Sequence, residues 1–523
     1  MIRFAVTAPK ERWEAVQHGV KLFDWPNDQY LQNFGLRIDS APAKVKARIL
    51  PTPDIHFGSG KVSGSEAVRG RWRIDGKRFF TVNKEPLKSW GFCVLKHPRF
   101  GREAVSQQAA QAFCNKFVEI YKSHGGVFAR TDPAIFLGDP KKGPNLISDA
   151  WNSTGTKFQM EPQLIFFVMP EKPLTDLYQR IKKSCECRYG IVSQMVQADH
   201  VSKCQAQYVS NVCMKVNAKL GGSTCQAVGN LLPQISVKDY KNIPTMIIAA
   251  DVSHAPPGSE GGSMCAITCS LDRHFTRYSA LCQTNGYRVE IITTENIESL
   301  LGEMMQQWMK NFNGILPKRI LYIRDGVSEG QYQFVLSQEV RDMKALCRKL
   351  RPNDTVKFTV VIAAKRHHIR FFPTQGSQVD RNGNPLPGTL VETGCTHPYE
   401  FDWYMNSHVA LKGTARPVHY HVLANDENGF NPQELQQVIF EHSFQYARAT
   451  TPVSQHPAVY YAHLASKRAA AHVQEPGVSS GKKDEKEKKA EGTQASSSSK
   501  FADVPPLIEL NPSRGIRSTM WYI

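Results

Sequence analysis

The chain contains 523 residues, of which 41% are hydrophobic, and its 65 Lys and Arg residues outnumber its 47 Asp and Glu residues, giving a net charge of +18. This length predicts two to four domains, and the positive charge favours a polyanionic partner, with nucleic acid as the natural candidate. No run of 18 apolar residues occurs, so no segment is expected to span a membrane.

The 12 cysteines do not follow a zinc-binding pattern. Cys185 and Cys187 stand close together, as do Cys265 and Cys269, but neither pair has a matching second pair at zinc-finger spacing. Most cysteines are therefore expected to be small buried side chains. The first residues, MIRFAVTAPKERWEAV, lack the apolar core of a signal peptide, which favours reduced thiols in the cytosol or nucleus.

The first two regions of the chain differ in pattern. Residues 1–86 mix short strand-like runs with Pro and Gly. Residues 87–225 alternate strand and helix signals, which predicts a parallel sheet covered by helices. The expected strands are 91–95, 163–169 and 191–196, and the expected helices are 104–124, 175–189 and 207–220.

Two pairs of polar residues stand out in these helices. Tyr178 and Lys182 are four residues apart, as are Lys215 and Lys219, so each pair lies on one side of its helix. By itself, a lysine pair of this kind marks a solvated face more often than a binding site. The apolar residues of the last helix that should face the core are Val209, Val212, Val216 and Leu220.

The third region begins with an apolar run, 246–252, that contains Asp251 and precedes a Pro-Pro-Gly turn. A second apolar run, 320–323, leads into Asp325. In an open α/β sheet, side chains at the carboxyl ends of strands line the functional crevice. Taken singly, each Asp would more often cap the next helix or turn.

The remaining elements of this region follow in a definite order. Strands are expected at 265–271 and 278–283, then a helix whose apolar stripe from Ile297 to Phe312 packs in the core. A strand at 320–323, a helix at 334–347 and a strand at 358–363 complete the series. The order is consistent with an RNase H-like fold, although periodicity alone would suit another α/β fold equally.

The end of the chain changes composition twice. Residues 473–500 are charged, rich in Ser and almost free of apolar side chains, so this stretch cannot repay its ordering entropy and is predicted to be a disordered surface insertion. Residues 504–510 and 520–523 are apolar again. The C-terminus is therefore expected to fold back onto the domain.

Four residues stand far apart in short, distinctive strings: Asp251, Glu290, Asp325 and His463. Hydrolysis of a phosphodiester needs an activated water and a stabilised leaving oxygen, and a pair of Mg²⁺ ions about 3.5–4 Å apart supplies both. Magnesium prefers oxygen ligands and needs few dedicated protein ligands. The four residues together suggest a two-metal nuclease.

Six motifs strengthen this interpretation: ADVSH, RDGVSEGQ, KRHHIR, THPYEFDWY, GTARPVHYHVL and YYAHLASKR. Together and in this order they resemble the Piwi domain of eukaryotic Argonaute proteins, with a fungal quelling-type member expected. The resemblance implies that Asp251, Glu290, Asp325 and His463 form a catalytic tetrad. It also implies that Asp251, Asp325 and His463 bind two Mg²⁺ ions and that Glu290 completes the site. Without the resemblance, Glu290 would be taken as a solvated strand residue.

The resemblance also implies a domain organisation. Residues 1–86 would be part of the second linker, residues 87–225 a Rossmann-like MID domain, and residues 226–523 an RNase H-like Piwi domain that carries the insertion at 473–500. The chain is then expected to be one lobe of a longer protein.

In the MID family, the helix NVCMKVNAKLGG marks a pocket for the 5′ phosphate of a guide strand. Converging ammonium groups and an amide favour a terminal phosphate over a hydroxyl end, and a Tyr ring can stack on the unpaired first base. The loop 169–178 is slightly longer than is usual in the family, which leaves only a weak expectation of uridine as the first base. The carboxylate of Ile523 is expected near this pocket. The implied pocket residues are Tyr178, Lys182, Gln194, Lys215, Lys219 and Arg468.

Further residues are implied to follow the backbone of the guide strand. Contacts of this kind position a strand without reading its sequence. Three histidines, His254, His367 and His368, are expected to be hydrogen-bonded packing residues and not catalytic ones. The implied guide-backbone residues are Lys365, Arg366, His408, Arg416, Arg448, Ser454 and Tyr460.

The resemblance thus implies a small-RNA-guided silencing effector that cleaves complementary target RNA. It is expected to be a monomer in the cytoplasm, with the nucleus as a further location, and its protein partners stay open. One alternative is a guide-binding module that cannot cut in this truncated form. Another is an unguided RNase H-like nuclease, which would have no need for the 5′-phosphate pocket.

Overall fold

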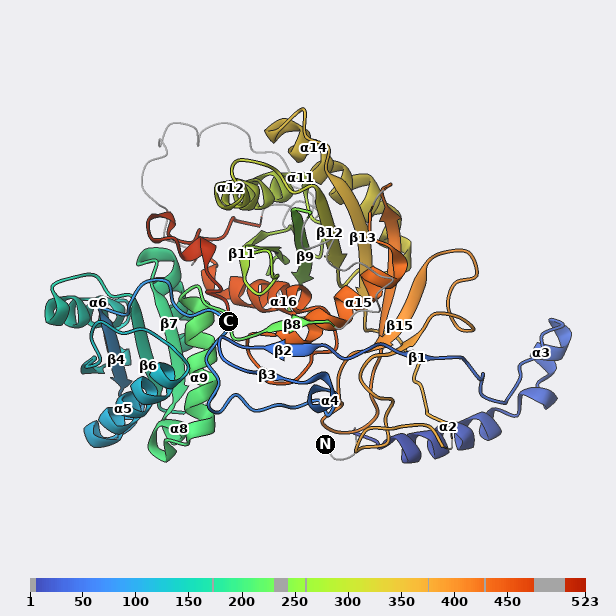
Figure 1. The fold of residues 1–523 in the computed structure, drawn as a ribbon, viewed down its shortest axis with the longest axis horizontal. Coiled ribbons are helices and arrows are strands. Elements are labelled where there is room, and N and C mark those ends of the chain that lie inside the picture. The colour runs from blue at the N-terminus through green and yellow to red at the C-terminus, as the bar shows by residue number, and fades with distance from the viewer. Residues whose placement is uncertain are drawn as a thin grey trace, which may run out of the picture.

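The computed structural model describes residues 6–171, 174–229, 243–258, 261–374, 376–427, 429–474 and 504–523. In these residues a four-stranded sheet and a nine-stranded sheet form two bodies, and a small three-stranded sheet lies between them (Figure 1). The C-terminus lies where the two larger bodies meet. None of the helices described is long and apolar enough to cross a membrane.

The N-terminal segment reaches across the molecule. Helix α2 (Pro9–Phe23), the turn η1 (Trp25–Asn27) and helix α3 (Gln29–Asn33) lie on the side away from the four-stranded sheet (Figure 1). Strand β1 (Arg48–Ile49) then pairs with β14 at the edge of the nine-stranded sheet. The small sheet joins this segment to a distant one, since β2 pairs with both β3 and β8. Its elements are β2 (Asp54–His56), β3 (Lys61–Val62), α4 (Gly64–Ala67) and β8 (Gln226–Val228).

The four-stranded sheet is parallel throughout, with the order β5-β4-β6-β7. Its central strands are buried along their whole length, which requires cover on both faces. Helix α5 packs against α8 and α9, and α6 packs against β4 and β5. The strands are β4 (Trp90–Leu95), β5 (Ala134–Gly138), β6 (Leu164–Met169) and β7 (Val192–Gln197). The helices are α5 (Gln107–Ser123), α6 (Asn145–Phe158), α7 (Thr175–Lys183), α8 (Ala198–Lys203) and α9 (Ala206–Lys219).

The predicted α/β architecture of this region is confirmed, with some differences. Sequence analysis missed β5, α6 and α8. The helix expected at 175–189 is divided into α7 and a π-helical turn, η3 (Ser184–Arg188). The stripe expected to face the core on α9 does so, since Val209, Val212 and Val216 are buried.

The nine-stranded sheet is mixed, with the order β1-β14-β15-β16-β13-β12-β9-β10-β11. Strand β12 runs parallel to both β9 and β13, while β9, β10 and β11 form an antiparallel meander. The strands are β9 (Thr245–Ser253), β10 (Met264–Ser270), β11 (Tyr278–Thr284), β12 (Arg319–Arg324), β13 (Lys357–Ala364), β14 (Thr389–Val391), β15 (Asp402–Asn406) and β16 (Val418–Asn425).

Helices cover this sheet, and α16 packs directly on β9, β10 and β11. The predicted apolar stripe from Ile297 to Phe312 is confirmed as core, because its residues are buried. The helices are α11 (Thr294–Asn296), α12 (Gly302–Asn311), α13 (Tyr332–Phe334), α14 (Arg341–Leu350), α15 (Pro432–His442) and α16 (Pro457–Ala469). The π-helical turns η4 (Ile297–Leu301) and η6 (Val335–Val340) precede α12 and α14.

The C-terminal segment folds back onto the protein, as predicted. Residues Leu507, Leu510 and Met520 to Ile523 are buried, and the Trp521 indole donates a hydrogen bond to the Ala280 carbonyl of β11 at 3.0 Å. The insertion predicted at 473–500 lies outside the described residues from 475 onward.

Candidate active site and anion-binding site

Asp251 and Asp325 come from neighbouring parallel strands. Asp251 is near the end of β9, Asp325 follows β12 directly, and the register places Arg324 opposite Ala250. The Asp325 amide donates to the Ala250 carbonyl at 3.4 Å. The two carboxylates therefore share one edge of the sheet, as expected from the apolar runs before them. The prediction that Asp251 ends its strand is slightly wrong, because β9 continues to Ser253.

Helix α16 supplies two partners for Asp251. His463 Nδ1 lies 3.1 Å from Asp251 Oδ2, and the Ser466 hydroxyl donates to the same oxygen at 2.9 Å. Burial alone would raise the pKa of Asp251, but the hydrogen bonds and charge of these partners outweigh it and lower the pKa. Asp251 is thus held as a carboxylate, and His463 remains 45% exposed.

Asp325 lies in a different electrostatic setting. The Gly326 amide donates to Asp325 Oδ1 at 2.8 Å, and the Gln455 amide donates to Oδ2 at 3.2 Å. Burial and the negative charge of Asp251 raise the pKa of Asp325 in spite of these bonds. The negative charge of Asp251 therefore disfavours a second negative charge on Asp325.

The loop after β11 brings Glu290 to the same edge of the sheet, although this loop is separated in sequence from both strands. Its carboxylate accepts hydrogen bonds from Arg324 Nη1 at 3.1 Å and from His254 Nε2 at 2.8 Å. Gly326, next to Asp325, has a φ of +90°, and a Cβ there would lie 2.9 Å from Glu290 Oε1. Glycine at position 326 thus allows both the turn and the close approach of Glu290.

A buried ion pair supports this loop. Arg324 is fully buried, and its Nε lies 3.3 Å from Glu339 Oε1. The Tyr322 hydroxyl donates to Glu339 at 2.7 Å, which fixes the carboxylate. Arg324 then donates to both the side chain and the backbone carbonyl of Glu290. The role of Arg324 in holding Glu290 was not predicted from the sequence, although Arg324 stands directly before Asp325 in the RDG string.

The histidines near these elements have distinct environments. His254 is hydrogen-bonded, as expected: it contacts Glu290 and, through Nδ1, the Ser263 hydroxyl at 2.8 Å. It therefore positions a candidate catalytic carboxylate. His367 fits the packing prediction, because its Nε2 bonds the Pro417 carbonyl, whereas His368 is exposed.

Two buried carboxylates that repel each other suit a divalent cation, which would remove the repulsion. The ligand atoms of Asp251, Asp325 and His463 do not all lie within 4.8 Å of one another; of the residues described, only Asp402, His419 and His421 reach that spacing. Two ions about 3.5–4 Å apart would spread their ligands more widely than one ion. The predicted ligand set therefore stays a prediction.

The second candidate site is a buried cluster of cations between the two bodies. Lys182 Nζ donates to the Ser193 carbonyl at 2.9 Å, and Lys219 Nζ donates to the same carbonyl at 3.0 Å. Lys219 also donates to Gln194 Oε1 at 2.9 Å. Arg468 arrives from α16 and donates to the Tyr178 hydroxyl at 2.7 Å. Side chains from α7, β7, α9 and α16 thus meet here, while their role at a guide 5′ phosphate stays a prediction.

One carboxylate, Glu186, balances this cluster. It pairs with Arg468, lies 2.9 Å from His472 Nε2 and lies 3.8 Å from Lys182 Nζ. Burial would raise the pKa of Glu186, but Arg468, His472 and Lys182 outweigh it and lower the pKa to about 2. Sequence analysis missed Glu186, although the i, i+4 spacing of Tyr178 and Lys182 continues to it.

Positive charge is nevertheless in excess here. Burial, with the charge of Arg468, lowers the pKa of Lys182 to about 8. Burial together with Lys182, Arg468 and Lys215 holds the pKa of Lys219 well below its usual range. Cations that disfavour one another in a buried site favour an anion among them.

Ile523 is buried at this junction, and the neighbouring Tyr522 carbonyl lies 3.5 Å from Arg468 Nη2. The C-terminus therefore lies beside the cluster, whereas contact by its carboxylate stays a prediction. The weakly expected uridine preference also stays untested, because Lys172 and Pro173 of the relevant loop are outside the described residues.

The residues predicted to follow a guide backbone do not form one contact network. Lys365 Nζ lies 2.5 Å from the Ser454 hydroxyl, which lies 2.6 Å from the Tyr460 hydroxyl. His408 lies near the charge of Lys365, and its Nδ1 is buried without a partner. Burial lowers the pKa of His408 to about 3, so this imidazole is neutral. Arg366 and Arg416 are exposed, and Arg448 is half-buried near Tyr446.

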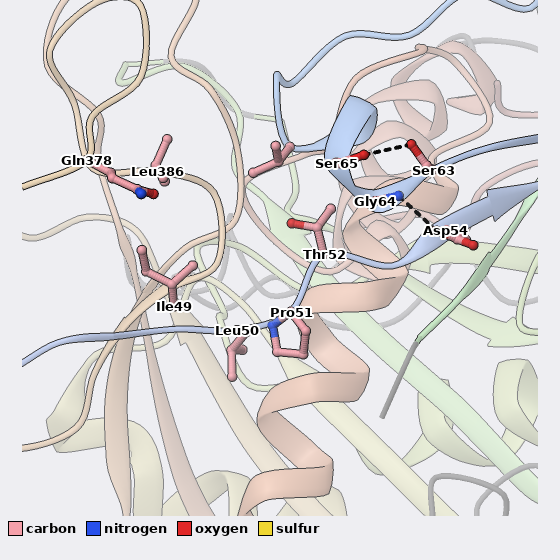
Figure 2. Close-up of a pocket in the computed structure, with 11 residues that line it drawn as sticks. Ile49, Leu50, Pro51, Thr52, Asp54, Ser63, Gly64, Ser65, Gln378 and Leu386 are labelled. Atoms are coloured by element: carbon pink, nitrogen blue, oxygen red, sulfur yellow. Dashed lines mark hydrogen bonds between the residues drawn. The ribbon is translucent and has the colours of Figure 1, made fainter. Parts of the chain in front are cut away.

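A pocket in another part of the molecule has fewer ionisable side chains than the two candidate sites. Figure 2 shows it between the N-terminal segment around Thr52 and the loop that carries Gln378 and Leu386. Asp54 is the only acidic residue lining it, and this carboxylate already pairs with Lys61 and accepts from the Gly64 amide. The pocket shares no residue with either candidate site.

Comparison with known proteins gives a consistent result. The family model of the Piwi domain matches residues 164–474, and that of the Argonaute linker 2 domain matches residues 11–57. The protein argonaute of Schizosaccharomyces pombe is 33% identical, over 100% of this chain and 59% of its own length. The chain thus spans well under two thirds of that relative.

Solved structures agree in fold. A Kluyveromyces polysporus Argonaute crystallised with a guide RNA matches with a TM-score of 0.79 and 24% identity, covering 100% of this chain and 61% of that one. The C-terminal lobe of a budding yeast Argonaute matches with a TM-score of 0.74 and 25% identity, covering 92% of this chain and 95% of that one.

Proposed function

The chain belongs to the Argonaute family, and from that premise we propose that it anchors a guide RNA by its 5′ phosphate and cleaves complementary RNA. The fold is that of a Piwi lobe, RNase H-like in its larger body. The observation that carries the proposal is the convergence of Asp251, Asp325, Glu290 and His463 at the ends of β9 and β12.

Asp251, Asp325 and His463 would hold Mg²⁺, which when bound supplies an activated water and stabilises the leaving oxygen of the phosphodiester. Asp251 presents an ionised carboxylate to such a site, and Glu290 is held beside Asp325 by Arg324 and His254. His463 must exchange its bond to Asp251 before its Nδ1 can serve as a ligand.

The cation cluster supports the other half of the proposal. A 5′ phosphate carries up to two negative charges and several acceptor oxygens, and Lys182, Lys219 and Arg468 offer charged donors in a buried setting. The Tyr178 ring, with the Arg468 guanidinium 5.4 Å from its centre, is available to stack on the first base. Lys215, Gln194 and the proposed guide-backbone residues would complete the path of the guide strand.

Base pairing between guide and target would then supply the specificity, while the protein grips the duplex by its shape. By the same family resemblance we propose a quelling-type role, a monomeric state, and a cytoplasmic location that extends to the nucleus. Because the chain spans 59% of its S. pombe relative, all of these activities are proposals.

The test is cleavage of a complementary RNA by the chain loaded with a 5′-phosphorylated guide, in Mg²⁺ and then in EDTA. Cleavage at one position set by the guide, and lost in EDTA, would support the proposal. Guide binding without cleavage would instead support a guide-holding module. Equal affinity for guides with a 5′ phosphate and a 5′ hydroxyl would favour an unguided nuclease.

A further inference from the structure

A second group of metal-ligating side chains lies on the hairpin of β15 and β16. Asp402 pairs across the hairpin with His421, and His419 lies two residues before it on the same face of β16. The candidate ligand atoms of these three residues all lie within 4.8 Å of one another. Their side chains are only 3%, 14% and 10% exposed for Asp402, His419 and His421.

Each of the three side chains is oriented by a contact. The His397 amide donates to Asp402 Oδ1 at 2.9 Å, so Oδ2 faces the histidines, and His419 Nε2 lies 2.6 Å from that oxygen. His421 Nε2 lies 2.7 Å from Glu400 Oε2. The Glu400 side chain is 55% exposed, so it is free to move toward or away from the group.

Aromatic rings fix the two imidazoles. Tyr404 stacks on His419 with ring centres 4.4 Å apart and an angle of 12° between the planes. The Tyr332 ring lies 5.2 Å from that of His421. The ligand group is therefore assembled in advance on a rigid hairpin, which lowers the entropy cost of binding an ion.

We propose that Asp402, His419 and His421 bind one divalent transition-metal ion of the zinc class. Two imidazole nitrogens and one carboxylate oxygen are a ligand set that zinc uses, whereas magnesium prefers oxygen ligands. Glu400 or a water would take the fourth position. On binding, the proton of neutral His419 moves from Nε2 to Nδ1 so that Nε2 can ligate the ion, which takes the place of the hydrogen bond to Asp402.

This site does not depend on the proposed nuclease. It shares no residue with the Asp251 and Asp325 group, and strand β13 lies between β16 and β12 in the sheet. Tyr332, which contacts His421, begins α13 in the segment that follows Asp325. A bound ion would therefore tie the β15–β16 hairpin beside that segment and stabilise both.

The experiment uses the full chain, stripped of metal with EDTA, dialysed, and titrated with Zn²⁺ alone and Co²⁺ alone in the presence of excess Mg²⁺. Metal content by mass spectrometry should reach one tightly held zinc per chain, and Co²⁺ should give the visible absorption of a tetrahedral site. Zinc should also raise the melting temperature, because an ion that binds only the folded state stabilises it.

Substitutions test which side chains bind the ion. The double substitution His419→Asn and His421→Asn should lower zinc affinity by more than about tenfold, because it removes two of three protein ligands. His368→Asn, an exposed histidine in the same body, and Asp325→Ala should leave it unchanged. Absence of tight zinc in the unaltered chain overturns the proposal without any variant. Zinc lost in Asp325→Ala and kept in the double variant overturns it as well, because the ion then belongs to the other site.

Discussion

Two sites of opposite charge in this protein are built in the same way. One is the carboxylate site at the ends of β9 and β12, and the other is the cation cluster at the junction of the two bodies. In the first, Asp251, Asp325 and Glu290 are largely buried, and one arginine, Arg324, donates to Glu290. In the second, Lys182, Lys219 and Arg468 are buried, and one carboxylate, Glu186, pairs with Arg468 and lies 3.8 Å from Lys182. Each site contains a single buried counter-charge that orders it without neutralising it.

Such a counter-charge stabilises a buried charged site and still leaves charge for a ligand. A buried charge is tolerated when one partner pairs with it, and removing that partner is costly. The charge left over in each site favours a ligand of the opposite sign, a cation for the first site and an anion for the second. Substitutions of ligand-facing residues and of the counter-charges should therefore have different effects.

The largest effect is expected from a ligand-facing carboxylate. Asp325→Ala should reduce guided cleavage by at least about 1,000-fold, since it removes a proposed metal ligand, while guide binding stays nearly unchanged. Single-turnover cleavage and guide affinity measure the two separately. Asp75→Ala, an exposed carboxylate, is the matched control and should cleave normally. Mg²⁺-dependent cleavage that survives in Asp325→Ala would contradict the assignment.

A counter-charge should act on stability. Glu186→Gln should lower the free energy of unfolding at pH 7 by about 3 kcal/mol, because the pKa of Glu186 falls from an ordinary value near 4.5 to about 2 on folding. A depressed pKa contributes stability above pH 4.5 that is lost as the pH falls toward 2. Urea unfolding of both proteins at several pH values should show the difference shrinking across that window. A difference independent of pH would mean that the charge of Glu186 is not its cause.

A ligand-facing cation should act on binding. Lys219→Met should weaken binding of a 5′-phosphorylated guide by about 10- to 100-fold, the loss expected for one charge-assisted hydrogen bond. Binding of a 5′-hydroxyl guide should change little. Lys203→Met, an exposed lysine on the neighbouring helix α8, serves as the control. Equal weakening of both guides by Lys219→Met would show a general effect on the fold and not on phosphate recognition.

The smallest effect is expected from a residue that only positions another. His254→Asn should slow cleavage by about tenfold, because Glu290 loses one of its two side-chain donors and keeps Arg324. Guide affinity and target affinity should be unchanged, so the change should appear in the single-turnover rate alone. His368→Asn is a matched exposed control. An unaltered rate in His254→Asn would mean that Arg324 suffices to hold Glu290.

Much of the fold could be predicted from local pattern. The strand around Asp251, the strand before Asp325 and the stripe from Ile297 to Phe312 each have a continuous or periodic apolar signal, and each is present and buried. Strand β5 was missed although its sequence, Ala134–Gly138, contains the apolar run AIFL; it is an edge strand, and three of its five residues are not buried. Helices α6 and α8 were missed as well, and α8 is only six residues long.

The residues of the candidate sites also divide into those that local sequence could predict and those that depend on tertiary contacts. Residues in distinctive strings, such as Asp251, Asp325 and His463, could be named from the sequence because the strings carry the family resemblance. Glu186, His472, Ser466 and Gln455 could not, because each becomes important only by contacting a residue hundreds of positions away or in another element. The same holds for Asp402, His419 and His421, which antiparallel pairing of two strands brings together.

The sequence by itself determined the α/β class, the family and the chemical type of each ligand-facing residue, because these depend on residue identity and spacing along the chain. Only the tertiary structure decided which buried counter-charges hold those residues and how far apart the ligands lie. The physical reason is that charge interactions depend on distance and burial in space, and a linear pattern specifies neither between segments that meet only after folding.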